Sequence, residues 1–207
     1  MQSIQFIIFL FILFFSVVVH EFSHGYVAYL NGDDTARLLG RLTFNPIPHI
    51  DPVGTLLLPV LLILSSIVTR GQMFIIGWAK PVPINPFNFR DYDKGMFSVG
   101  IAGPASNILL GTIFALLSRN LAGGFTKDIF LFTGSINFIL AFFNLIPIPP
   151  LDGSRILGVF LPESIRYRYN QLEKMGFMLV LAFLLLGGFS LIIPPVEAIV
   201  RILAGTR

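Results

Sequence analysis

Long stretches without any charged residue are the feature that most constrains this chain. Five such stretches have 18 or more residues each: 1–19, 52–69, 95–118, 129–151 and 175–196. A helix needs about 20 apolar residues to cross the hydrocarbon core of a bilayer. The stretches are continuous rather than alternating, which argues against a transmembrane β-barrel. We therefore expect an all-α membrane protein, a polytopic transmembrane helical bundle.

The composition excludes several other classes of protein. Of 207 residues, 55% are hydrophobic and 12% are charged, about half the charged share of soluble domains. Because the chain has no cysteine, it is not a disulfide scaffold. Its high hydrophobicity also excludes a soluble enzyme and a disordered segment. The net charge of +3 comes from residues scattered in short loops, so we expect the lipid bilayer, and no nucleic acid, as a partner.

The first apolar stretch does not read as a cleaved signal peptide. It has no lysine or arginine before Arg37, it is longer than a typical signal core, and no small-residue cleavage site follows it. We expect a retained helix over about Ile4–Leu30, stopped by the polar sequence Asn31-Gly32-Asp33-Asp34.

The end of this helix carries an HExxH motif, His20-Glu21-Phe22-Ser23-His24. A spacing of four residues puts both imidazoles on one helix face, where they can bind one Zn²⁺. Glu21 can then reach water at the metal as a general base. Ionisable residues inside a membrane helix cost about 3 kcal/mol or more each and usually mark function. The motif therefore predicts a metal site.

A catalytic zinc site needs a third protein ligand, and two candidates stand out. One is His49. The other is Asp152, which follows the proline-rich stretch Asn144–Leu151. Prolines there interrupt the helix, and irregular backbone at that depth is tolerated only beside protein or a water-filled cavity. Asp152 could also simply cap a helix, but an incomplete zinc site nearby favours its role as a ligand.

These motifs together resemble the site-2 protease family of intramembrane zinc metalloproteases, and in particular its compact bacterial branch. The similarity rests on the HExxH motif and on Asn144-x-x-Pro147-x-x-x-Leu151-Asp152-Gly153. Three further segments between these motifs add to it: His49–Thr55, Gly77–Pro83 and Gly103–Asn107.

This resemblance implies one Zn²⁺ per chain held by His20, His24 and Asp152, with Glu21 as the catalytic base. It implies that the substrate is a membrane-spanning protein cut in or near its transmembrane segment, in regulated intramembrane proteolysis. An anti-sigma factor or a similar regulator is the kind of substrate it suggests. We expect a single membrane-embedded metalloprotease domain over 1–207, in a bacterial plasma membrane.

The distribution of basic residues predicts the orientation. Helices at about 95–118 and 128–147 would leave the side of the metal site and return to it, while Pro52–Ala79 would form a short re-entrant or β-like hairpin. Nine basic residues then lie on the side of the site and at most five on the other. Because cytoplasmic loops are rich in lysine and arginine, we expect the active site near the cytoplasmic face. The nine are Arg37, Arg41, Lys80, Arg90, Lys94, Arg155, Arg166, Arg168 and Lys174.

Other polar residues have two interpretations each. Asn144 is expected either to orient the substrate, including its developing oxyanion, or to make a hydrogen bond between helices, and Asn107 has the same alternatives. His49 belongs either beside the site or to an ordinary loop. The extended stretch Trp78–Asn85 either pairs with the substrate as an added strand or is an interfacial loop.

Two other functions use the same residues. A membrane metal-ion transporter also buries histidine and carboxylate ligands, but the chain shows no internal repeat and conduction does not require Glu21. A catalytically silent scaffold is the second, and the intact HExxH motif argues against it.

Overall fold

The computed structural model describes residues 2–57, 60–61 and 77–206, and this part of the chain is helical, without strands. Most of the hairpin expected over Pro52–Ala79 lies outside the described residues. The longer helices are α1 (Gln2–Leu30), α4 (Tyr92–Ser118), α5 (Phe125–Asn144), α6 (Asp152–Phe160), α7 (Glu163–Gln171), α8 (Gly176–Leu185) and α9 (Phe189–Ala204). Short elements are α2 (Thr35–Leu38), η1 (Ile47–His49), η2 (Pro52–Leu57), η3 (Pro86–Asn88) and η4 (Leu172–Met175).

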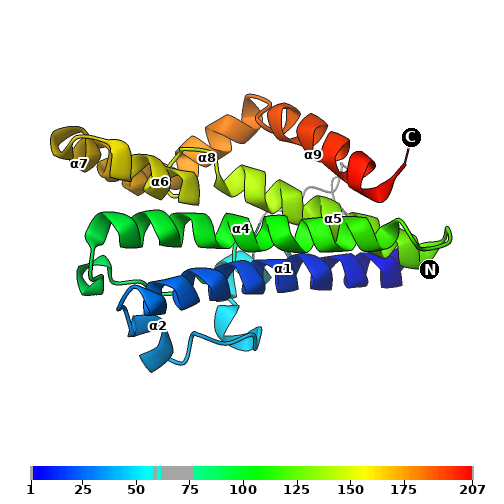
Figure 1. Cartoon of the computed structure of the whole chain (residues 1–207), viewed down its shortest axis with the longest axis horizontal. Coiled ribbons are helices and arrows are strands. Elements are labelled where there is room, and N and C mark those ends of the chain that lie inside the picture. Colours follow the sequence, from blue (N-terminus) through cyan, green and yellow to red (C-terminus); the bar gives the residue numbers. More distant parts are fainter. Residues whose placement is uncertain (1, 58–59, 62–76, 207) are drawn as a thin grey trace.

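Three helices form the framework of the molecule. Among the described residues, α4, α5 and the Ile4–Leu30 part of α1 are each long and apolar enough to cross a membrane. They lie side by side, with α4 antiparallel to α1 and α5 (Figure 1). At 1.5 Å per residue, the 29 residues of α1 are about 43 Å long, so the helix can cross with tilt. The expected all-α membrane architecture is confirmed.

The face of α4 that meets α1 and α5 is built from a four-residue repeat. Val99, Gly103, Asn107 and Gly111 follow one another at i, i+4 spacing and are all buried, so they share one face of the helix. The two glycines let neighbouring helices approach closely, and Asn107 places a polar group between them. This face of α4 is where the three helices meet.

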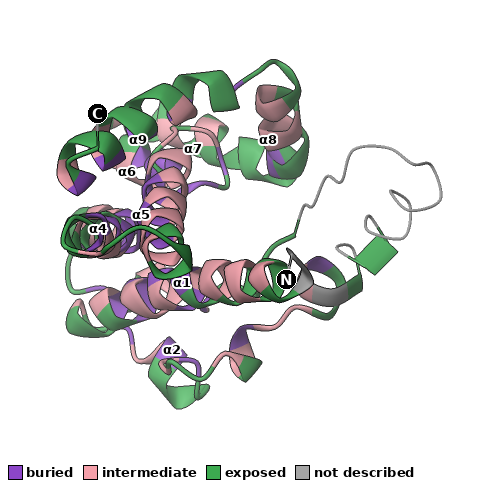
Figure 2. Ribbon diagram, turned by 90° about the vertical axis from the view of Figure 1, so that its right-hand side faces the viewer, coloured by how far each residue is buried: buried purple, intermediate pink, exposed green. Residues whose placement is uncertain are grey.

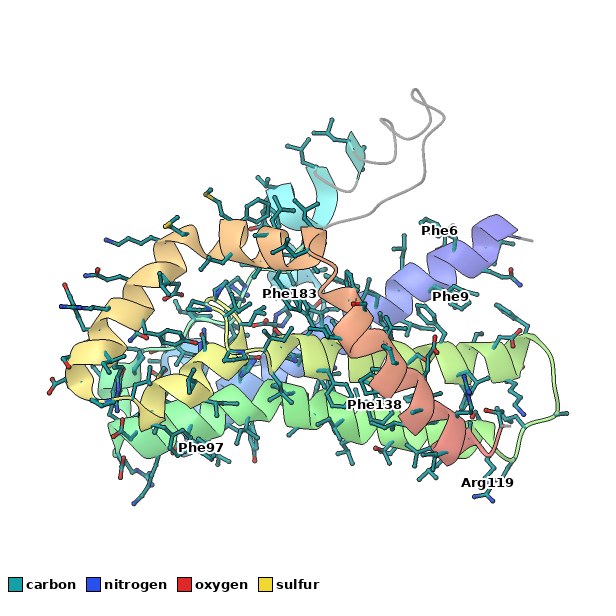
Figure 3. All side chains as sticks on the ribbon, turned by 90° about the horizontal axis from the view of Figure 1, so that it is seen from above. Phe6, Phe9, Phe97, Arg119, Phe138 and Phe183 are labelled. Carbon is teal, nitrogen blue, oxygen red and sulfur yellow. The ribbon has the colours of Figure 1, made fainter. Side chains whose placement is uncertain are left out.

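The C-terminal part runs across this framework. Helices α8 and α9 are bent by 70° at a short break that follows Leu185, where Gly187 has a positive φ of 87°. Phe138 of α5 packs with Ile192 and Val196 of α9 in a hydrophobic core, which Phe183 of α8 also contacts (Figure 3). Helix α9 starts before the Pro194–Pro195 pair and continues through it. If α7–α8 and α9 form one bent span, the described residues contain four candidate spans.

Burial follows the pattern expected in lipid rather than in water. Buried residues of α1, α4 and α5 face one another, while exposed residues cover the outer faces (Figure 2). Many of those exposed residues are large and apolar, such as Phe11 at 66% and Leu109 at 61% exposure. An exterior with this many exposed large apolar side chains is stable in a bilayer and unusual on a soluble protein.

Candidate metal centre

The two histidines of the HExxH motif lie on one buried face of α1. His20 and His24 are 6% and 4% exposed, and their Nε2 atoms are 3.0 Å apart. The helical spacing of four residues produces this convergence, as the sequence predicts. Two imidazole nitrogens so close together, away from water, need a shared positive partner.

Asp152 completes the group from the other end of the sequence. Helix α5 ends at Asn144, a proline-containing turn follows, and Asp152 is the first residue of α6. The turn folds tightly, because a Cβ on Gly153 would collide with the carbonyl group of Leu145. Asp152 is 6% exposed, and its Oδ2 lies 3.1 Å from Nε2 of both histidines. Arg155 lies 4.0 Å from the other carboxylate oxygen.

The three ligand atoms have the spacing that a tetrahedral zinc site requires. Their separations of 3.0, 3.1 and 3.1 Å form a nearly equilateral triangle. With zinc–ligand distances of about 2.0–2.1 Å, the edge of a tetrahedron is about 3.3 Å. Two neutral imidazoles and one carboxylate are also a donor set that zinc prefers. Among the described residues, this is the one group of histidine and acidic side chains positioned to hold a metal ion.

Each histidine is held from behind through its other ring nitrogen. His24 Nδ1 lies 2.7 Å from the backbone oxygen of Val99, and His20 Nδ1 lies 2.5 Å from Asn107 Oδ1. Both partners are acceptors, so each Nδ1 donates and each Nε2 is left free to face a metal. Asn107, one of the candidates from the sequence, therefore contacts a predicted ligand directly.

Gly103 allows α4 to approach the histidines this closely. A Cβ atom at this position would collide with both imidazole rings. Gly103 lies one helical turn from Val99 and one from Asn107, the two residues that hold the rings. A single face of α4 therefore supplies both hydrogen bonds and the space for the rings between them.

Glu21 is positioned by a different part of the chain. Its Oε2 accepts a hydrogen bond of 2.8 Å from the backbone N–H of Val82. The Val82 side chain is 5% exposed and packs close to Gly25, one turn further along α1. Within the described part of the chain, the hydrogen bonds leave Glu21 Oε1 without a partner.

The segment around Val82 is anchored by several hydrogen bonds. Trp78 N–H donates to Gly54 O and Lys80 N–H to His49 O, while the buried Arg41 donates to the carbonyl groups of Lys80 and Pro81. From 80 to 83, every backbone N–H is therefore either bonded within the chain or absent because the residue is proline. An added substrate strand would find no donor there, so these bonds favour the loop interpretation over residues 80–83.

The remaining candidates lie apart from the ligand triangle. The side chain of His49 is fully buried, and its Nε2 lies 3.0 Å from Thr43 O. Its backbone oxygen accepts from Lys80 N–H in the 80–83 segment. Asp152, and not His49, is the third member of the triangle. Asn144 donates to Leu140 O in its own helix, and no hydrogen bond among the described residues joins it to the ligands.

Sequence reasoning missed two polar residues beneath the site. Asn137 in α5 and Ser16 in α1 are both buried, and Asn137 lies 2.7 Å from Asn107. In the sequence, Ser16 precedes His20 by one helical turn, and Asn137 is a polar amide within an otherwise apolar stretch. Polar side chains in membrane helices usually form hydrogen bonds with a neighbouring helix. This rule could have singled out both residues, but it does not predict which partner each one finds.

Comparisons with known proteins identify the family of the chain. Residues 118–187, which include Asp152, match the model of peptidase family M50. YwhC of Bacillus subtilis, provisionally named a zinc metalloprotease, is 40% identical over 179 residues, covering 82% of this chain and 76% of YwhC. Rip2 of Mycolicibacterium smegmatis, also provisionally named so, is 30% identical over 82% of this chain and 63% of its own length. No solved structure shows significant similarity to the chain.

A more distant relative covers more of this chain. The zinc metalloprotease MJ0392 of Methanocaldococcus jannaschii is 28% identical over 92% of this chain, which spans 45% of MJ0392. The chain therefore belongs to peptidase family M50, the site-2 protease family. It is a membrane metalloprotease, and zinc is its metal.

Proposed function

We propose that this chain is an intramembrane protease that binds one Zn²⁺ through His20, His24 and Asp152. The single observation that carries the proposal is the buried triangle of ligand atoms, in which residues 128 positions apart lie 3.1 Å from each other. When bound, Zn²⁺ supplies Lewis acidity, activating water and polarising the scissile carbonyl group.

Glu21 is the proposed general acid and base. Val82 N–H holds its Oε2 and fixes the carboxylate, so that Oε1 is available for proton transfer. It takes the proton from the attacking water and delivers it to the leaving amine.

The proposed substrate is a membrane-spanning protein. A substrate helix hides its carbonyl groups in hydrogen bonds, so it must unwind locally before it can be cut. Helix-breaking residues near the cut site should therefore matter more than a strict side-chain code. A regulatory protein held at the membrane, such as an anti-sigma factor, fits this class.

The proposed orientation puts the active site near the cytoplasmic face. The ligands lie towards the C-terminal end of α1, and α6 and α7 with their basic residues lie at that same end of the molecule (Figure 1). The two termini lie at the opposite end. With the excess of basic residues in the loops of the site's side, this arrangement favours an N-terminus outside the cytoplasm.

The test compares wild type with Glu21→Gln, in detergent or vesicles, using a single-span membrane protein as substrate. We expect both proteins to bind one zinc ion per chain, while the variant loses cleavage by at least about 100-fold, as typical for a general base. A transporter would instead move zinc in both proteins and cut nothing. That result would overturn the proposal.

A further inference from the structure

We propose that Asn137 and Asn107 form a relay that holds the His20 ring through a hydrogen bond from its Nδ1–H, and so points Nε2 at the metal site. This inference rests on the proposed zinc site and adds two positioning residues to it. The relay connects α5, α4 and α1 in sequence, through side chains that are all buried.

The relay begins at Asn137, whose amide can face its neighbours in only one orientation. Asn137 Nδ2 donates to the backbone oxygen of Thr133 at 2.9 Å and to Ser16 Oγ at 2.9 Å. A backbone carbonyl can only accept, so the NH₂ end of the Asn137 amide must face Thr133. Its oxygen is thereby turned towards Asn107.

The orientation of the Asn137 amide determines that of the Asn107 amide. Asn107 Nδ2 donates to Asn137 Oδ1 at 2.7 Å and approaches Ser16 O, a second backbone carbonyl, at 3.4 Å. The Asn107 oxygen must therefore face His20, where it lies 2.5 Å from Nδ1. Because an amide oxygen only accepts, His20 must carry a proton on Nδ1, and its Nε2 faces the other two ligand atoms.

Burial makes this orientation hard to reverse. Asn107 and Asn137 are both 0% exposed, so water cannot replace a lost partner. Turning either amide over would set donor against donor or acceptor against acceptor, and unpaired polar groups in a low-dielectric interior are costly. The orientation is therefore built into the fold before any metal binds.

His24 provides an internal comparison. Its Nδ1 meets the backbone oxygen of Val99 directly, at 2.7 Å, with no side chain between. A change at Asn137 should therefore weaken the hydrogen bond of His20 Nδ1–H and leave that of His24 as it is. A general loosening of the bundle would affect both histidines.

The experiment follows the Nδ1–H groups of His20 and His24 by ¹H–¹⁵N NMR of zinc-loaded protein, in which the metal occupies Nε2 of both rings. The chain has three histidines, so His49→Gln simplifies the assignment. In wild type we expect hydrogen-bonded Nδ1–H signals, protected from exchange with water, from both His20 and His24. In Asn137→Leu, the His20 Nδ1–H signal should shift and exchange faster with water, while the His24 signal is unchanged.

Zinc affinity, measured by competition with a chelator, gives a second readout. Direct hydrogen-bond partners of ligands are worth about 10- to 100-fold in affinity, so we expect a smaller loss, about 3- to 10-fold, for Asn137→Leu. Ser118→Ala is the matched control, because Ser118 is a buried polar residue of α4 whose hydroxyl bonds Ala115 O, away from the relay. Its affinity should be unchanged.

Three results would overturn the relay: no hydrogen-bonded Nδ1–H on His20 in wild type, an unchanged His20 in Asn137→Leu, or equal changes at His20 and His24. The wild-type spectrum decides the question even if the variant does not fold. These results are independent of the Glu21→Gln test, so the relay can fail while the proposed protease function stands.

Discussion

The metal ligands and the catalytic base are held by two different regions of the molecule. His20 and His24 are fixed from within the bundle by one face of α4, through Asn107 and the Val99 carbonyl. Glu21, although it is the neighbour of His20, is fixed from the other side by the backbone of the 80–83 segment. Adjacent residues on one helix therefore depend on separate supports. Zinc binding and cleavage should be separable by mutation.

The largest effect should come from the ligand region itself. Asp152→Ala removes one of the three ligand atoms, so we expect zinc affinity to fall by more than about 100-fold, and cleavage to be lost with it. Metal analysis after dialysis against a weak chelator measures this. Asp128→Ala, an exposed acidic residue of α5, is the control and should retain one zinc ion. Full zinc content in Asp152→Ala would show that another residue is the third ligand.

Gly103→Ala should disturb the same region without removing any ligand. The added methyl group would collide with both imidazoles, so the rings must move and we expect zinc affinity to fall by about 10-fold or more. Gly123→Ala is the matched control, since a Cβ there has no atom within 4 Å. Equal affinities for the two variants would contradict the close approach of α4 to the histidines.

The 80–83 segment that holds Glu21 should show the reverse pattern, in which cleavage falls while zinc binding is kept. Arg41→Met removes the charged donors that bind the carbonyl groups of Lys80 and Pro81, so the segment holding Glu21 loses an anchor. We expect cleavage to fall by about 3- to 10-fold with zinc content unchanged, because hydrogen bonds to charged groups contribute about 1.5–3 kcal/mol and only part of this reaches Glu21. Arg37→Met, at an exposed arginine paired with Asp34, should cleave normally.

Replacing Lys80–Pro83 as a block is a stronger version of this test. It removes the Val82 packing as well as its anchors, so cleavage should fall further than in Arg41→Met. Loss of zinc in either variant would show that the two regions are not separate.

The smallest effect should be a pH dependence of stability at Asp33. This residue follows α1 and accepts hydrogen bonds from Asn85 and Asn88, just beyond the 80–83 segment that holds Glu21. Burial raises the pKa of Asp33, but hydrogen bonds from Thr35, Asn85 and Asn88 outweigh it and hold the pKa below its usual value. A carboxyl group with a lowered pKa stabilises the fold above its unfolded-state pKa, and this contribution disappears as the pH falls through the folded-state value. Thermal unfolding between about pH 6 and pH 3 should therefore show acid destabilisation.

Asp33→Asn should reduce that acid sensitivity, at the cost of lower stability near neutral pH, because an amide cannot accept all four hydrogen bonds. Asp128→Asn should leave the pH profile as it is in wild type. An unchanged profile in Asp33→Asn would show that another group controls the acid response.

The parts of the site that follow a short spacing rule were predictable. The His20–His24 pair follows from helix periodicity, and Asp152 follows from a proline-rich break beside an incomplete metal site. The long helices follow from the charge-free stretches. The family resemblance drew attention to Asn107, but its contact with His20 depends on how α4 packs against α1.

The supports of the site were not predictable in the same way. The Val82–Glu21 bond uses a backbone N–H, which leaves no trace in side-chain chemistry. The role of Asn137 depends on the rotation of α5 against α4, which hydropathy does not specify. Strand addition at Trp78–Asn85 was a reasonable expectation from extended sequence, but the three-dimensional contacts of Lys80 and Val82 use up the donors it needs over 80–83.

The most direct test of the account is the anomalous scattering of a zinc-loaded crystal at the zinc edge. We predict one strong peak per chain, within about 2.0–2.2 Å of His20 Nε2, His24 Nε2 and an Asp152 carboxylate oxygen. A peak that omits Asp152, or one that lies elsewhere in the chain while the protease is active, would contradict the proposed site.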